Sequence, residues 1–259
     1  MGVFSERVTR RFRLDAAELA FLEQLEARPL AVPRGHMLVR TGDPAEYAVV
    51  LTAGWAMSYT SMPDGSSQVR RLHFPGDLVA MPSVPMHHHA EDIEMVSEAE
   101  IAPFPKRLLA GLFGLPRLAA IMYMLAQAER ITAGDRLASL QGSPAKARIA
   151  FLLVDILHRL RSADRSVAST FEMHLTREQA AHVTGMTPVH ASRMWSALIA
   201  EGLIACEGHI VTVLDEPRLA RLSQYRGLED DFDHGWLAHV QPSPTPGERA
   251  APRIADIVR

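Results

Sequence analysis

The stretch that decides the fold is residues 175–213, LTREQAAHVTGMTPVHASRMWSALIAEGLIACEGHIVTV. Thr176 and Gln179, near its start, have the spacing of a capping box, in which the threonine hydroxyl accepts the third helical amide and the glutamine reaches back. A helix is therefore predicted to begin at Arg177. Gly185 is predicted to end it, because glycine readily adopts the left-handed conformation that follows a helix.

A second helix is predicted just after that glycine. Thr187 supplies an N-cap and Pro188 a favoured first helical residue, and the helix is expected to run to about Ala200, before Gly202. Two short helices joined by a tight glycine turn make a helix-turn-helix. Residues 203–213 then read as a two-stranded hairpin, which predicts a wing beside the helix pair.

The second helix carries the predicted DNA contacts, because the N-terminal residues of a recognition helix lie toward base edges in the major groove. The side chains predicted to contact bases are Val189, His190, Ser192 and Arg193. Those predicted to contact phosphates are Thr176, Arg177 and Thr187. The predicted packing face comprises Val183, Ala191, Met194 and Leu198. Arg193 is the candidate guanine reader, because its planar fork matches two acceptors on one base.

Positive charge is sparse in this motif. The whole chain of 259 residues has a formal net charge of −3, and residues 171–200 contain only Arg177 and Arg193 as basic residues besides histidine. The segment before the motif is richer in cations, and we expect it to help bind DNA. Those cations are Lys146, Arg148, Arg159, Arg161 and Arg165.

The N-terminal half has a different pattern of apolar and turn-forming residues. After a short predicted helix at 15–26, residues 36–104 consist of short apolar runs separated by turn signals at regular distances, which is typical of an antiparallel sandwich or barrel. Asp64 and Gly65 mark a hairpin between residues 55–60 and 68–74.

A long helix is predicted at 116–140. Apolar and small residues repeat on it at three- and four-residue steps: Leu118, Ile121, Leu125, Ala128 and Thr132. We predict that these residues pack on a second copy of the helix in a dimer; the alternative is that the helix lies against its own sheet. The expected domains are a sensor at 1–115, a dimerisation helix at 116–141, a winged helix-turn-helix at 142–225 and a largely flexible extension at 226–259, mobile beyond about residue 237.

Composition limits the cofactors and the compartment. The single cysteine, Cys206, excludes an intrachain disulfide, a four-cysteine zinc site and an iron-sulfur cluster held by four thiolates of one chain. Cys206 is expected to be a small core residue, and a cytoplasmic location is expected because the N-terminus lacks an apolar signal core. Residues 108–126 have nearly the length and the apolar composition of a membrane span. Pro116 at their centre is better placed to begin a new helix, so no membrane association is expected.

At this point a family is visible. A β-rich half containing Pro75-Gly76-Asp77, a long central helix and the helix-turn-helix together resemble the Crp/Fnr transcription regulators over roughly residues 20–225. The resemblance implies an α+β fold, in which a β-roll of the cyclic-nucleotide-binding type senses a signal and paired winged helices of a homodimer bind a near-palindromic promoter site. It also implies that Arg193 reads guanine and Thr176, Arg177 and Thr187 hold phosphates. Val189 stands where many members have a base-reading glutamate, which puts their best-known half-site in doubt.

The sensor is not expected to bind cyclic AMP. Family members hold its phosphate with an arginine shortly after the Pro-Gly-Asp turn, whereas residues 77–105 contain no Lys or Arg and six acidic residues, and His89 and Ala90 align with the phosphate-binding pair. No cofactor is predicted, and an unknown small-molecule effector is left open. RNA polymerase is a further partner that transcription activation would involve.

The histidine run at 87–89 supports one alternative function. His87, His89 and Glu94 resemble the ligand spacing of cupin metal enzymes, so a metal sensor or metalloenzyme is the second hypothesis, against a simple polar loop. His36 and His73 are expected to be packed rather than ligating. Because the chain has neither a serine nucleophile elbow nor a glycine-rich phosphate loop, an enzyme is not predicted.

Overall fold

The computed structural model describes residues 1–62, 67–228 and 231–240. Two helices, α1 (Val3–Thr9) and α2 (Ala16–Leu25), precede the strands. The strands of the N-terminal half are β1 (Leu30–Val32), β2 (Met37–Val39), β3 (Tyr47–Ala53), β4 (Ala56–Ser61), β5 (Ser67–His73), β6 (Asp77–Val79), β7 (Asp92–Met95) and β8 (Ala99–Pro105). Short 3-10 helices η1 (Met81–Ser83) and η2 (Lys106–Gly114) accompany them.

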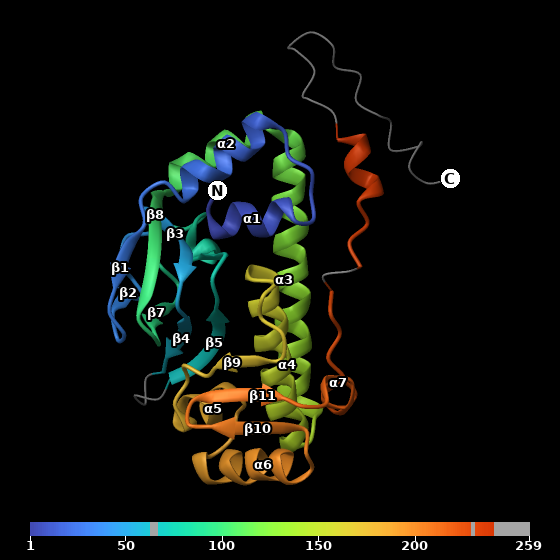
Figure 1. Cartoon of the computed structure of the whole chain (residues 1–259). Helices are drawn as coiled ribbons and strands as arrows, with labels where there is room; N and C mark the ends of the chain where they lie inside the picture. Colours follow the sequence, from blue (N-terminus) through green and yellow to red (C-terminus); the bar gives the residue numbers. More distant parts are fainter. Residues whose placement is uncertain (63–66, 229–230, 241–259) are drawn as a thin grey trace, which may run out of the picture.

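The C-terminal half is mostly helical. Its helices are α3 (Pro116–Gly142), α4 (Ala145–Ala163), α5 (Arg177–Val183), α6 (Pro188–Ala200), α7 (Glu216–Ser223) and the 3-10 helix η3 (Gly235–His239). Its strands are β9 (Thr170–Glu172), β10 (Ile204–Glu207) and β11 (Ile210–Val213). In Figure 1, α3 runs the length of the molecule, with the β-rich half on one side and the α5–α6 module at one end.

The β-rich half is the predicted antiparallel sandwich. One sheet has the order β1-β8-β3-β6 and the other β2-β7-β4-β5, with every neighbouring pair antiparallel. Alternate residues point between the sheets, where Leu51, Ile93 and Met95 are fully buried. β4 and β5 pair from Ser61↔Ser67 inward, as a hairpin requires, while the predicted turn at Asp64-Gly65 falls outside the described residues.

The long helix differs from its prediction in the face that it exposes. Leu118 and Ile121 are fully buried in the core of their own chain, packed with residues of α1 and α2. Leu125, Ala128 and Thr132 are half-buried and also face the chain. The five predicted dimer positions thus lie on the inner face. Three- and four-residue spacing indicates a stripe along one face of a helix, but it does not show whether the same chain or a second copy covers that stripe. On the opposite face, α3 exposes Tyr123, Ile131 and Leu137.

Among the described residues, none of the helices is long and apolar enough to cross a membrane. The segment that imitates a span is divided between η2 and α3, with Pro116 as the first residue of α3, as predicted.

α4 joins the two halves into one core. Its residues Ile149, Leu153 and Ile156 are fully buried in a cluster that also contains Trp55 and Phe74 of the β-rich half and the buried side chains of the helix-turn-helix. Trp55 makes edge contacts with Phe74 and with His174, at ring-centroid separations of 4.8 and 5.1 Å. The sensor half and the helix-turn-helix of one chain are therefore packed together, not merely linked.

A buried carboxylate connects the same parts electrostatically. Asp77, 1% exposed, accepts hydrogen bonds from Arg7 Nη1 at 2.7 Å and Arg159 Nη2 at 2.5 Å, and lies 3.6 Å from Arg71 Nη2. Burial by itself raises the pKa of Asp77, but the guanidiniums of Arg159, Arg71 and Arg7 outweigh it and hold the pKa well below its ordinary value. Asp77 is therefore ionised at neutral pH and joins α1, β5, β6 and α4.

The chain beyond α7 returns along α3 (Figure 1). Arg226 pairs with Asp135 of α3 at 2.8 Å, Phe232 makes an edge contact with Phe12, and Leu237 is buried. The described part of the extension therefore packs on the chain. The predicted mobility beyond residue 237 falls mostly on residues 241–259, which lie outside the described residues.

We predict that Asp77→Asn lowers the free energy of unfolding at neutral pH by about 3–5 kcal/mol, because it leaves buried guanidiniums without their counter-charge. The folded pKa of Asp77 is depressed, so its contribution is present above the unfolded pKa of about 4 and is lost as pH falls through the folded value. Urea unfolding at neutral and acidic pH measures both effects. Asp135→Asn, which removes a largely exposed ion pair, is the control and should cost less than about 1 kcal/mol.

Candidate nucleic-acid interface

Both capped helices of the sequence prediction are present. Thr176 Oγ1 accepts a hydrogen bond from the Gln179 amide at 3.1 Å, and Gln179 Oε1 accepts one from the Thr176 amide at 2.9 Å, which completes the capping box of α5. Gly185 has φ +63°, the left-handed conformation expected in the turn. Thr187 Oγ1 caps α6 by accepting from the His190 amide at 3.3 Å. The helix-turn-helix prediction is confirmed.

The wing is also present, and it is larger than predicted. β10 and β11 form the expected antiparallel hairpin, from Ile204↔Val213 to Glu207↔Ile210. β9 adds a third strand on the far side of β11, with Val211 opposite Phe171. Its three residues are too few to show a period in the sequence, so this strand was not anticipated.

All seven predicted DNA contacts lie on the surface. Val189 is 66% exposed, and the other six side chains are also exposed: Thr176, Arg177, Thr187, His190, Ser192 and Arg193. Val189, Ser192 and Arg193 line one shallow surface concavity on α6 together with Pro188 and Ser196. In Figure 1, α6 lies at the end of the molecule, where no other element covers it. This helix face is therefore open to a large partner.

Behind this face, α6 packs much as predicted. Ala191 and Leu198 are buried, Val183 of α5 is buried against them, and Met194 is half-buried. Trp195, which is not among the predicted packing residues, is buried on the same face. Its position four residues after Ala191 was a sufficient signal, because residues four apart share a helix face.

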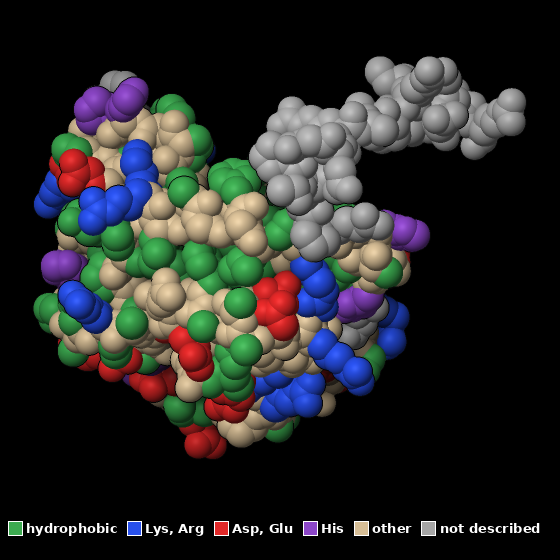
Figure 2. Space-filling view, turned by 90° about the horizontal axis from the view of Figure 1, so that it is seen from above, with side chains coloured by type: hydrophobic (Ala, Val, Ile, Leu, Met, Phe, Trp, Pro, Cys, Tyr) green, Lys and Arg blue, Asp and Glu red, His purple; other side chains and the backbone are tan. Residues whose placement is uncertain are grey.

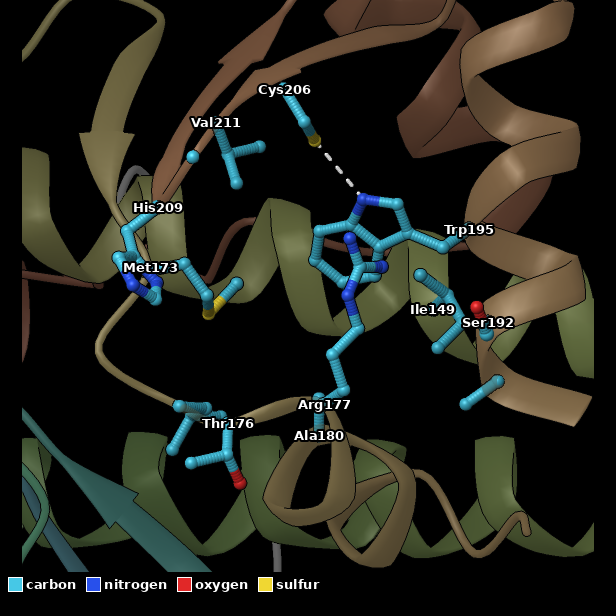
Figure 3. A pocket seen from close by; sticks show the side chains of 13 residues that line it. Ile149, Met173, Thr176, Arg177, Ala180, Ser192, Trp195, Cys206, His209 and Val211 are labelled. Atoms are coloured by element: carbon cyan, nitrogen blue, oxygen red, sulfur yellow. Dashed lines mark hydrogen bonds between the residues drawn. The ribbon is translucent and has the colours of Figure 1, made fainter. Parts of the chain in front are cut away.

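Trp195 connects the recognition helix with the wing and with α5. Its Nε1 donates a hydrogen bond to Cys206 Sγ at 3.0 Å, and the guanidinium of Arg177 lies 5.5 Å from its ring centroid (Figure 3). Cys206 is partly buried and packs on the core, as predicted. Arg177 thus lies over an aromatic ring, a favourable position for a cation, above a cavity of about 130 Å³.

The cations before the motif are largely occupied inside the chain. Lys146 pairs with Glu201 at 2.6 Å, Arg148 donates to the carbonyls of Thr184 and Gly185, and Arg161 pairs with Glu216 at 2.8 Å. Arg159 is held by Asp77. Lys146 and Arg148 thus hold α4 to the helix-turn-helix, Arg161 holds α4 to α7, and Arg159 holds α4 to β6. Figure 2, seen from the end away from α6, has basic and acidic side chains interspersed with hydrophobic ones.

The predicted metal ligands are not brought together. His87 is exposed, His89 is buried, and Glu94 lies half-buried on β7 opposite Met57. The backbone of the run pairs with residues 42–45, for example through a hydrogen bond from the His89 amide to the Asp43 carbonyl at 2.8 Å. Across the described ranges, no three His, Cys, Asp or Glu side chains could hold a metal ion. The cupin-like alternative is not supported.

The two isolated histidines differ from each other. His73 is buried and its Nε2 lies 3.2 Å from Ser58 Oγ, as expected for a packed residue; burial lowers its pKa well below the ordinary value. His36, which was also expected to be packed, is exposed at the start of β2.

Comparisons with known proteins match both halves of the chain. A model of the Crp-like helix-turn-helix domain matches residues 147–222, and a model of the cyclic nucleotide-binding domain matches residues 29–114. Electron transport regulator A of Shewanella oneidensis is 24% identical over 213 residues, and the fumarate and nitrate reduction regulatory protein of Escherichia coli K12 is 25% identical over 213. Each alignment covers 82% of this chain and 85% of the relative.

Solved structures show the same fold. FixK2 from Bradyrhizobium japonicum superposes with a TM-score of 0.67 at 22% identity, covering 77% of this chain and 98% of FixK2. A CooA mutant from Carboxydothermus hydrogenoformans gives 0.61 at 12% identity, covering 86% and 96%. A cyclic-nucleotide-binding-type sensor followed by a Crp-like helix-turn-helix defines a two-module transcription regulator. The chain belongs to the Crp/Fnr family of these regulators.

Because the turn between α5 and α6 needs a positive φ at Gly185, we predict that Gly185→Ala destabilises the protein by about 1–2 kcal/mol. Gly142→Ala is the matched control: Gly142 ends α3 without a positive φ and has open space around it, so alanine should be neutral or slightly stabilising. Thermal unfolding measures both variants. Equal stability of the two would contradict the assignment of strain to the turn.

Proposed function

We propose that the protein is a sequence-specific transcription regulator, acting in the cytoplasm as a homodimer on a near-palindromic promoter site. The observation that carries this proposal is the capped α6 with its exposed N-terminal face. An open helix of this kind in a winged helix-turn-helix fits the major groove, and two copies related by a twofold axis would read two half-sites. The function proposed is binding rather than catalysis.

In this proposal the seven exposed side chains divide between bases and phosphates. Arg193 contacts a guanine through two parallel hydrogen bonds, and Val189 contacts a thymine methyl group, since it cannot accept from a cytosine amine. His190 and Ser192 lie on the same face of α6. Thr176, Arg177 and Thr187 hold phosphates, for which Arg177 must leave the ring of Trp195.

The proposed dimer forms through the outer face of α3. Tyr123, Ile131 and Leu137 are 60%, 48% and 56% exposed there, which is unusual for three large apolar side chains on one helix. Two exposed small residues near them, Gly134 and Ala138, would let a second helix approach closely. The helix is about 40 Å long, enough for several coiled-coil layers.

The proposed regulator does not depend on cyclic AMP or an iron-sulfur cluster. Residues 77–105 contain no Lys or Arg to hold a cyclic phosphate, and the chain has one cysteine. Asp92, within that segment, is used structurally: it accepts hydrogen bonds from the Thr41 amide at 2.8 Å and Ser61 Oγ at 2.7 Å. RNA polymerase would be a partner if the bound dimer activates transcription.

We expect Arg193→Ala to weaken binding to a palindrome selected from random DNA by about ten- to a hundredfold, since a bidentate contact is worth about 1–3 kcal/mol. Binding to unrelated DNA should change little, because Arg193 reads a base and not the backbone. Fluorescence anisotropy at fixed salt measures both. Arg221→Ala, on exposed α7, is the control and should bind like the wild type. Failure of the wild type to enrich any sequence would refute the proposed function.

A charge in the proposed dimer face should separate the subunits. Ile131→Glu places two carboxylates in an apolar helix seam, so we expect monomers in sedimentation velocity and loss of binding to the full palindrome. Phe113→Glu, at a still more exposed apolar position on η2, is the control and should leave the dimer intact. A monomeric wild type would refute the proposed homodimer, and a dimeric Ile131→Glu variant would place the interface elsewhere.

A further inference from the structure

A second cavity lies where the two halves of the molecule meet. Its volume is about 90 Å³, and its walls come from α1, β5, α3, α4 and the segment after α7. Six arginines line it: Arg7, Arg11, Arg70, Arg71, Arg136 and Arg159. Two acidic residues, Glu129 and Asp155, line it as well. We refer to this space as the arginine cavity.

The arginine cavity is separate from the segment where the family binds cyclic nucleotides. None of its lining residues comes from residues 77–105. Much of its wall, including Arg7, Arg136 and Tyr225, lies outside residues 29–114 and 147–222, the two ranges that the family models match. The remaining lining residues, including Arg70, Arg71 and Arg159, lie within the matched ranges, so the cavity combines segments inside and outside the two matched domains.

Positive charge exceeds negative charge around the cavity. Asp77 engages Arg7, Arg71 and Arg159, and Glu129 pairs with Arg71 at 2.5 Å. Apart from Arg7 and Arg11, which have further interactions within the chain, four guanidiniums line the cavity with two carboxylates, Glu129 and Asp155, among the described residues. Burial raises the pKa of Asp155, which disfavours its charged form and weakens this compensation further.

Two observations point to a missing acceptor. Arg71 Nη2 and Arg159 Nε are buried without a hydrogen-bond acceptor among the described residues. To the described residues, Arg136 donates two long hydrogen bonds, 3.3 Å to the Arg70 carbonyl and 3.4 Å to the Val183 carbonyl. Its pKa is lowered by burial and by repulsion from Arg159 and Arg71, against the attraction of Asp155. An anion in the cavity would relieve both the repulsion and the unmet donors.

We propose that the arginine cavity binds a doubly charged oxyanion, in the form of inorganic phosphate or the phosphate group of a small phosphomonoester. A cavity of about 90 Å³ has room for one tetrahedral oxyanion. A neighbouring cavity of about 140 Å³, lined mostly by apolar side chains, shares Arg7, Leu125 and Glu129 with it and can take an apolar substituent.

An occupant of the arginine cavity would contact both functional halves of the chain. Arg70 and Arg71 belong to the β-rich half, Arg136 to α3, and Arg159 to α4, which shares its core with the helix-turn-helix. The bound anion would therefore stabilise this particular packing of the two halves. It would couple a small molecule to the orientation of α6 without using the cyclic-nucleotide segment.

The test is isothermal titration of the full chain, without DNA, with inorganic phosphate and separately with phenyl phosphate, in chloride buffer. We expect saturable binding of one anion per chain. Tighter binding of phenyl phosphate would identify a phosphomonoester as the natural form, and binding of inorganic phosphate alone would identify the free ion. Because no DNA is present, the result is independent of the proposed function.

Variants decide whether the binding belongs to this cavity. Arg136→Gln should raise the Kd of the anion by about ten- to a hundredfold, the loss of affinity expected when one charge-assisted hydrogen bond is removed. Arg70→Gln, at an exposed position, should act in the same direction if Arg136→Gln fails to fold, while Arg107→Gln on exposed η2 should bind like the wild type. No binding by either anion at millimolar concentration, or undiminished binding by both cavity variants, would overturn the proposal.

Discussion

The structure depends most on the ionised carboxylate of Asp77, buried among arginines from three other elements. A charge in that position is costly to desolvate, and it persists because Arg7, Arg71 and Arg159 supply opposite charge at short range. The Phe74 amide also donates to it, at 2.9 Å, and closes the Pro-Gly-Asp turn. Apolar contacts could hold the same parts together in many registers, whereas directed hydrogen bonds to one carboxylate select a single arrangement.

That arrangement places the sensor half directly on the DNA-binding half. Trp55 and Phe74 enter the core that α4 shares with the helix-turn-helix, so a change in the β-rich half cannot be absorbed by a flexible linker. The arginine cavity lies beside this junction, with walls from both halves and from α3. This member of the Crp/Fnr family lacks a basic residue in the usual phosphate-binding segment. Its arginines instead line the arginine cavity, at the point where the two modules meet.

Sequence reasoning succeeded where signals are local. The caps at Thr176 and Thr187 and the turn at Gly185 each involve residues at most three apart, and backbone conformation in such short segments follows from residue type. It failed on α3, where Leu118 and Ile121 satisfied the expected spacing but are covered by α1 and α2. It also did not identify the partners of the α4 cations, because Lys146 and Arg148 have partners more than thirty residues away in the chain.

By itself, the sequence determined the order of modules, the capped helix pair, the outward position of Arg193 on α6 and the exclusion of an iron-sulfur cluster held by four thiolates of one chain. Only the tertiary structure decided which face of α3 is open, that His87, His89 and Glu94 do not converge, and that six arginines surround one cavity. The physical reason is the range of the interactions. Caps and turns are fixed by neighbours along the chain, whereas burial, charge compensation and cavities depend on segments that meet only after the whole chain has packed.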